Sequence, residues 1–124
     1  MATAAEIMTR KVVTTRVDVQ TWDAARVLLD KGHGGMPVVD AAGKLIGMVS
    51  GFDVISKKGT TVGEIMSRGV VNVKPDDSIE DVRQLMGLHG IRRIPVCDGD
   101  RLIGIISRSD LLAYYTDQYE HGDE

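Results

Sequence analysis

Two serine–aspartate pairs with the same spacing are the residues of this chain best suited to chemistry. Ser50 is followed three residues later by Asp53, and Ser107 is followed in the same way by Asp110. A carboxylate can accept hydrogen bonds from both hydroxyls of a ribose, and the free N–H groups at a helix start favour a phosphate. Ser-x-x-Asp is also a capping box, which needs no ligand. The two roles are compatible, because a capped helix start still presents free donors.

Three arginines near these pairs could supply positive charge. Arg92 and Arg93 precede an apolar run that starts at Ile94, and Arg108 lies inside the second Ser–Asp pair. A guanidinium group forms strong charge-assisted hydrogen bonds with phosphate oxygens. The alternative is that these arginines are ordinary solvated surface residues.

These residues belong to a repeat that covers most of the chain. Glu6-Ile7-Met8 returns as Glu64-Ile65-Met66, and Leu45-Ile46-Gly47 returns as Leu102-Ile103-Gly104. Two copies at a spacing of about 58 residues indicate a pseudo-symmetric pair of half-domains rather than a repeat array. Two related halves must share a boundary, so we expect the function to lie in matched clefts along it.

The hydrophobic pattern predicts the same order of elements in each half. β-branched runs at Val12-Val13 and Val70-Val71 predict a first strand, and helical spacing that ends at Gly32 and Gly90 predicts a helix. Apolar runs divided by a Gly- and Asp-rich turn predict a hairpin, and Asp53 and Asp110 begin a second helix. The expected class is therefore mixed α/β (α+β), with two β-α-β-β-α motifs packed as a pseudo-two-fold pair. The expected boundaries are a first motif at 6–56, a polar linker at 57–63, a second motif at 64–115 and a frayed polar tail at 116–124.

The composition excludes several classes of function. The chain has 124 residues, which is one domain's worth, so we expect the two halves to fold as one unit. The net charge is −3 without a basic run, which argues against a nucleic-acid partner. No apolar run reaches the roughly 20 residues that cross a bilayer, and we expect no secretory signal at the start. A single cysteine, Cys97, suits a reducing interior. We therefore expect a soluble, cytoplasmic protein.

This order of motifs resembles the CBS domain, the tandem module named after cystathionine β-synthase. The most specific segments are residues 90–96 and 104–110, and the resemblance extends over roughly residues 6–56 and 64–115. The family implies a pair of motifs, often called a Bateman module, with two clefts that commonly take adenine nucleotides or adenosyl ligands. It also implies frequent homodimerisation into a flat disc. Because this chain has no room for an attached enzyme, we expect a free-standing module with a protein partner that the sequence does not identify.

The resemblance implies a role for each candidate residue. Ser and Asp of each pair would contact the phosphate and ribose of one ligand, and Arg92 and Arg93 would reach the phosphate held by Ser50 and Asp53. Arg108 could add a further donor. The walls around the base would come from apolar residues, each of which could equally be plain core: Val12, Val13, Val70, Val71, Met36, Met48, Ile94, Pro95 and Ile105.

The first half departs from this pattern, because His33-Gly34-Gly35 stands where the second half has Ile91-Arg92-Arg93. The position that uses Asp110 therefore lacks two opposing cations. We expect two unequal sites, with the Asp53 site preferring a charged phosphate tail. The Asp110 site is expected to be weaker, to hold a less charged ligand, or to hold none.

These residues leave three candidate functions. The leading one is a non-catalytic sensor that binds AMP, ADP or ATP as a regulatory ligand and requires no cofactor. The alternative is a structural dimerisation module with empty clefts. An enzyme is the least favoured, because no histidine or metal-binding set lies beside either serine, and we expect no metal site: His33, His89 and His121 are isolated in the sequence. Cys97 is expected to be a small buried residue on a strand.

Overall fold

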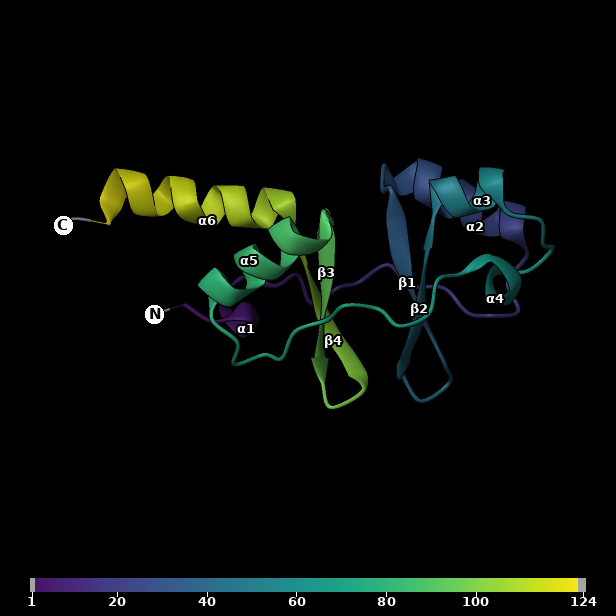
Figure 1. Cartoon of the computed structure of the whole chain (residues 1–124), viewed down its shortest axis with the longest axis horizontal. Coiled ribbons are helices and arrows are strands. Elements are labelled where there is room, and N and C mark those ends of the chain that lie inside the picture. The colour runs from purple at the N-terminus through teal and green to yellow at the C-terminus, as the bar shows by residue number, and fades with distance from the viewer. Residues whose placement is uncertain (1, 123–124) are drawn as a thin grey trace. The chain divides into compact units, whose positions relative to one another are not determined.

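The computed structural model describes residues 2–122, and these form two compact units that are described separately (Figure 1). Unit 1 holds the described residues of 1–12, 71–99 and 103–124, and unit 2 holds residues 13–70 and 100–102. Each unit combines helices with strands of a two-stranded sheet. The expected mixed class of helix and strand is therefore confirmed.

Unit 2 contains one hairpin and three helices. Its elements are α2 (Thr21–Lys31), β1 (Gly35–Val39), β2 (Leu45–Ser50), α3 (Gly51–Ser56) and α4 (Val62–Ile65). Strands β1 and β2 are antiparallel, and the register shifts at a bulge near the end of β1. Because β2 runs directly into α3, the first residues of α3 are fixed by the end of the sheet.

Unit 1 repeats this arrangement with longer strands and a longer last helix. Its elements are α1 (Ala4–Ile7), α5 (Ile79–His89), β3 (Arg93–Asp98), β4 (Arg101–Ser107) and α6 (Arg108–His121), with the first two residues of β4 grouped with unit 2. Strands β3 and β4 form the second sheet. As in unit 2, the last strand leads straight into a helix.

Helix α2 of unit 2 and helix α5 of unit 1 each end at the glycine that the sequence predicts. Gly32 after α2 and Gly90 after α5 take the left-handed conformation, with φ of 65° and 62°. Side chains with a Cβ rarely adopt this conformation, which is why glycine serves as a helix stop. At the other end of α5, the Ser78 hydroxyl accepts a hydrogen bond from the Asp81 amide and so caps the helix.

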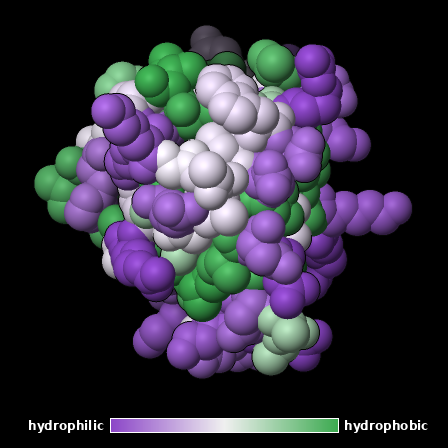
Figure 2. All heavy atoms as spheres, turned by 90° about the vertical axis from the view of Figure 1, so that its right-hand side faces the viewer, coloured by the Kyte–Doolittle hydropathy of each residue, from purple (hydrophilic) through white to green (hydrophobic). Residues whose placement is uncertain are grey.

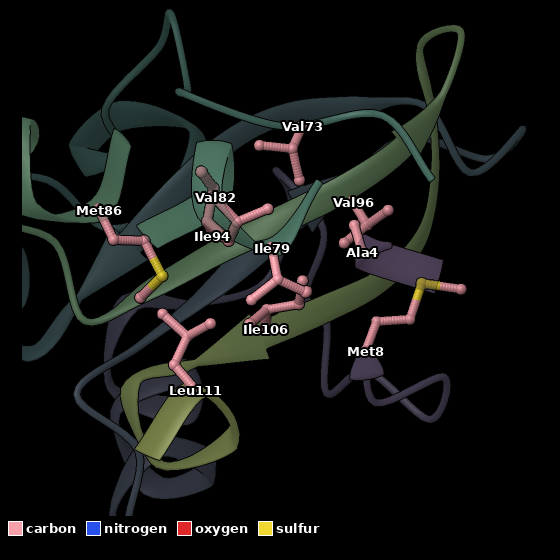
Figure 3. Close-up of a cluster of buried hydrophobic side chains, with 10 residues drawn as sticks. All are labelled: Ala4, Met8, Val73, Ile79, Val82, Met86, Ile94, Val96, Ile106 and Leu111. Atoms are coloured by element: carbon pink, nitrogen blue, oxygen red, sulfur yellow. The ribbon is translucent and has the colours of Figure 1, made fainter. Parts of the chain in front are cut away.

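Each unit has its own apolar core. Figure 3 shows the core of unit 1, in which side chains from α1, α5, α6 and the two strands converge. Its ten buried members are Ala4, Met8, Val73, Ile79, Val82, Met86, Ile94, Val96, Ile106 and Leu111. The core of unit 2 is built in the same way from Ala24, Leu28, Met36, Val38, Val49, Val54, Val62, Ile65 and Met66. Cys97 is also buried, as expected.

The repeated methionines explain the repeated glycines. The Met66 sulfur lies 2.7 Å from the place that a Cβ on Gly47 would occupy, and Met8 crosses Gly104 in the same way. Only glycine leaves room for this side chain against the strand. Each Glu-Ile-Met segment therefore packs on the Leu-Ile-Gly strand of the other repeat copy, so the folded units are offset from the sequence repeat.

Two sequence expectations need correction. The predicted first strands at Val12-Val13 and Val70-Val71 are not strands; pairing occurs further along, as single parallel bridges from Thr15 to Val38 and from Val73 to Val96. A β-branched run favours extended backbone, but the residues that pair are chosen by the neighbouring strand.

The expected frayed tail is also different. Residues 116–121 continue α6, which ends at His121, while residues 123–124 lie outside the described part. The helix is held to the unit by its first turns, where Leu111 is buried and the Tyr115 hydroxyl donates to Glu80 of α5 at 3.3 Å.

Candidate functional site

The first Ser–Asp pair forms a reciprocal capping box at the junction of β2 and α3. The Ser50 hydroxyl accepts from the Asp53 amide at 3.0 Å, and Asp53 Oδ2 accepts from the Ser50 amide at 2.9 Å. The junction is also held by a hydrogen bond from the Gly51 amide to the Gly34 carbonyl at 3.0 Å. These contacts fix both the hydroxyl and the carboxylate on the backbone.

Asp53 has a second partner that the sequence analysis missed. Its other oxygen, Oδ1, lies 2.9 Å from the Lys57 ammonium, and the Asp53 side chain is only 11% exposed. The same ammonium donates to the carbonyl of Ile65, the last residue of α4, at 3.1 Å. The signal for this ion pair was the spacing of four residues between an aspartate and a lysine on a helix.

The second Ser–Asp pair forms the same box at the junction of β4 and α6. The Ser107 hydroxyl accepts from the Asp110 amide at 3.1 Å, and Asp110 Oδ2 accepts from the Ser107 amide at 2.8 Å. The Arg108 amide donates to the Arg92 carbonyl at 2.8 Å, which matches the bond between Gly51 and Gly34 in unit 2. The capping interpretation is therefore correct for both pairs, and it leaves ligand contact open.

The two junctions differ in charge at three matching positions. Unit 1 carries three arginines, Arg92, Arg93 and Arg108, where unit 2 carries glycines at 34, 35 and 51. The Arg92 and Arg108 side chains are exposed and that of Arg93 is half-buried. The start of α6 thus carries a cluster of cations that the start of α3 lacks. The exchanges at Arg92 and Arg93 were expected from the sequence, and the one at Arg108 was not.

The expected pairing of Arg92 and Arg93 with the ligand at Asp53 is not tested. The structure brings Arg92 and Arg108 together with Ser107 in unit 1, through the bond between their backbones. The predicted pairing of Arg92 and Arg93 with Asp53 joins residues of different units and stays a prediction.

The apolar residues expected around a base divide into two groups. Met36, Ile94 and Pro95 are completely buried, and the first two belong to the cores of units 2 and 1. The others are half-buried: Val12, Val13, Val70, Val71, Met48 and Ile105. Only the half-buried group still has surface to offer a ligand.

The polar groups of both junctions are satisfied without a ligand. Within residues 2–122, no buried side-chain nitrogen or oxygen lacks a hydrogen-bond partner. In the same range no three side chains of His, Cys, Asp and Glu gather as metal ligands, and no helix is both long and apolar enough to span a membrane.

Comparison with known proteins gives a family match over nearly the whole chain. The family model described as CBS domain matches twice, at residues 4–59 and 62–117. The CBS domain-containing protein YhcV of Bacillus subtilis is 34% identical over 118 residues, which cover 90% of this chain and 84% of YhcV. The uncharacterized protein MJ0188 of Methanocaldococcus jannaschii is 39% identical over 111 residues, or 86% of this chain.

Several relatives are much longer than the matched region. The chain spans 42% of MJ0188 and 22% of a homoserine O-acetyltransferase of Methanohalobium evestigatum, to which it is 33% identical. The match to that enzyme therefore concerns a minor part of its length.

Solved structures show the same fold. The crystal structure of CBSX2 in complex with AMP has a TM-score of 0.89 and 26% identity, and the match covers 94% of this chain and 98% of that one. The CBS domain pair of protein MJ0100, in complex with 5'-methylthioadenosine and S-adenosyl-L-methionine, has a TM-score of 0.83 and 25% identity. That match covers 92% of this chain and 99% of the MJ0100 pair.

Proposed function

The chain belongs to the CBS domain family, and on this basis we propose that it is a non-catalytic regulatory module that binds an adenosyl ligand. Adenine nucleotides such as AMP or ATP are the proposed class, and the ligand acts as a signal rather than as a cofactor. The observation that carries the proposal is the duplicated box in which a carboxylate is fixed at the end of a strand, once at Asp53 and once at Asp110. The AMP complex of CBSX2, a protein with this fold, supports it.

The proposed chemistry uses a different group for each part of the ligand. A carboxylate held by a backbone amide has remaining lone pairs that can accept from both ribose hydroxyls. The cations Arg92, Arg93 and Arg108 provide charge-assisted donors for a phosphate. The half-buried apolar residues near the junctions offer surface to the base. The proposed contacts need no acid, base or metal, and no reaction is proposed.

Calorimetric titration tests this proposal directly. Adenosine, AMP, ADP, ATP and S-adenosyl-L-methionine are titrated into the purified chain. We expect at least one to bind, and an excess at about 100 times its Kd to stabilise the fold by roughly 2.7 kcal/mol. A chain that binds none of the five would contradict the proposal.

Asparagine variants separate the two positions. Asp53→Asn and Asp110→Asn each keep one carbonyl oxygen for the capping amide and lose the charge and the second acceptor oxygen. We propose that the sites are unequal, because the cations differ between the units, so the two variants are expected to lose different parts of the binding. Asp98→Asn, an exposed change at the end of β3, is the control of equal charge. Equal losses in both variants would contradict the asymmetry.

A second candidate function is supported by an exposed apolar face on unit 2. Trp22 and Leu29 of α2 and Phe52 and Ile55 of α3 are between 69% and 75% exposed. Figure 2 shows the side of unit 2 that carries α2, α3 and α4, where hydrophobic residues reach the surface in several areas between neutral and hydrophilic ones. Large apolar side chains exposed together favour a protein interface. We propose that this face forms a homodimer, which is compatible with ligand binding.

Sedimentation at several concentrations tests the dimer. We expect a dimer in the wild type and a monomer in the double variant Trp22→Lys, Phe52→Lys, with a melting temperature that depends on concentration only in the wild type. Because both side chains are exposed, the double variant is expected to fold. If the wild type sediments as a monomer at every concentration, this interface is wrong, whatever the outcome of the titrations.

A further inference from the structure

Lys57 connects the Asp53 carboxylate to the end of a different helix. Its ammonium lies 2.9 Å from Asp53 Oδ1 and 3.1 Å from the carbonyl oxygen of Ile65. Asp53 lies near the start of α3 and Ile65 ends α4, so the Lys57 side chain bridges two of the three helices of unit 2. The next residue, Met66, crosses Gly47 in the same core.

The bridge occurs in only one of the two junctions. Tyr114 stands four residues after Asp110, where Lys57 stands after Asp53. Among the described residues, Asp110 forms no ion pair, and its box is otherwise the same. The Lys57 contacts are therefore not needed to build a capping box.

The Asp53 carboxylate has little room for further partners while the bridge is formed. One oxygen is held by a backbone amide and the other by Lys57, and only 11% of the side chain is exposed. The carboxylate has about four lone-pair sites, of which the amide and Lys57 use two. A ribose that donates two hydroxyls must therefore compete with Lys57 for the small part of the carboxylate that is exposed. The backbone amide is fixed, whereas the Lys57 side chain is 44% exposed and flexible, so Lys57 is the partner that can leave.

We propose that Lys57 is a competing cation for the ribose position at Asp53, and that ligand binding there releases it and loosens α4. This inference rests on the proposed function, since it concerns the same carboxylate. The carboxylate contact is charge-assisted and is the stronger of the two that hold the ammonium. Once it is lost, the single bond to the Ile65 carbonyl is too weak to hold a flexible side chain in place. Ligand occupancy and the end of α4 are thereby coupled, and the coupling is reciprocal.

Titration with adenosine measures the competition, because adenosine carries the ribose but no phosphate charge. We expect Lys57→Met to bind adenosine about two- to fivefold more tightly than the wild type, which is the range for an ion pair with one exposed partner, here Lys57. Lys57→Arg retains a cation and is expected to keep the wild-type affinity. Lys58→Met, at the exposed neighbouring lysine, makes the same charge change and is expected to leave the affinity unchanged.

Hydrogen exchange measures the coupling to α4. Adenosine is expected to speed exchange of the Ile65 and Met66 amides by about twofold or more in the wild type. Lys57→Met is expected to show this faster exchange without ligand and to respond no further. The Lys58→Met control is expected to behave as the wild type does in both states.

The outcomes separate this inference from the proposed function. If adenosine and the nucleotides do not bind the wild type, the function is wrong and the competition falls with it. If adenosine binds and Lys57→Met weakens or does not change the affinity, the function stands and the competition is wrong. Exchange at α4 that is the same in Lys57→Met and Lys58→Met overturns the coupling on its own.

Discussion

The side chain of Met66 fills the space beside Gly47 that a β-carbon would need. The Met66 sulfur lies 2.7 Å from that position, and the Ser67 carbonyl oxygen lies 3.0 Å from it. The next strand residue, Met48, is tied to this segment by reciprocal backbone hydrogen bonds with Ser67, at 2.8 and 2.9 Å. The methionine and the glycine are therefore parts of one packed contact.

A methyl group at this position is expected to destabilise unit 2. Gly47→Ala must push both a methionine side chain and a backbone carbonyl, and overpacking of this kind costs about 1–3 kcal/mol. Chemical denaturation gives the free energy of unfolding. The control is Gly87→Ala in α5, where a Cβ meets no atom within 4 Å and alanine is expected to stabilise the helix by about 0.5–1 kcal/mol. Equal stability of the two variants would contradict this account of the packing.

Loss of a cap is expected to weaken α6 without a ligand present. Ser107→Ala removes the oxygen that accepts from the Asp110 amide and is expected to cost about 1 kcal/mol of unfolding free energy. Ser109→Ala, two residues further along at an exposed position of α6, is the control. The same denaturation experiment checks both variants, and a cost in Ser109→Ala as large as in Ser107→Ala would exclude capping as the cause.

Glu64 is expected to make part of the stability depend on pH. Hydrogen bonds from the hydroxyls and amides of Thr60 and Thr61 lower the pKa of its carboxyl below the ordinary 4.5. The folded chain then binds fewer protons at Glu64 than the unfolded chain near that pH. The stabilisation is thus present above pH 4.5 and is lost as the pH falls through the lower, folded pKa.

Thermal melts across acidic pH check this prediction. The wild type is expected to lose melting temperature more steeply below pH 4.5 than Glu64→Gln, which cannot titrate. Glu120→Gln, on the exposed last turn of α6, is the control and is expected to follow the wild type. Parallel curves for wild type and Glu64→Gln would contradict the prediction.

A double-mutant cycle tests which carboxylate, Asp53 or Asp110, holds the ligand that the arginines of unit 1 contact. Arg93→Met is expected to weaken AMP binding by about 1.5–3 kcal/mol, the range for a hydrogen bond to a charged group, and to leave adenosine binding nearly unchanged. The family resemblance predicts that this loss is coupled to Asp53→Asn and additive with Asp110→Asn. Arg68→Met, at an exposed arginine of unit 2, is the control. Coupling to Asp110 alone would assign the cluster to its own unit's junction.

The sequence predicted the elements whose signals are local. The capping boxes, the glycine helix stops and the hairpins each depend on residues a few positions apart, and all of them form as expected. The CBS family was also predicted from the order of the motifs, and the family model confirms it.

The features that were missed depend on contacts between distant segments. The first strands were placed at Val12-Val13 and Val70-Val71, but their partners select residues further along the chain. Residues 116–121 are polar, yet they extend a helix whose start is capped and packed, so their own composition did not decide their structure. The Lys57 bridge to Ile65 required knowing that α4 returns to α3, which no spacing in the sequence records.

The offset between repeat and unit has a consequence for how such a chain can be divided. Met8 packs against the strand that carries Gly104, and Met66 packs against the strand that carries Gly47. If the chain is divided at the boundary between the repeats, Met8 is separated from Gly104 and Met66 is separated from Gly47. Each fragment then has an unfilled space beside its glycine and a methionine side chain without its packing partner.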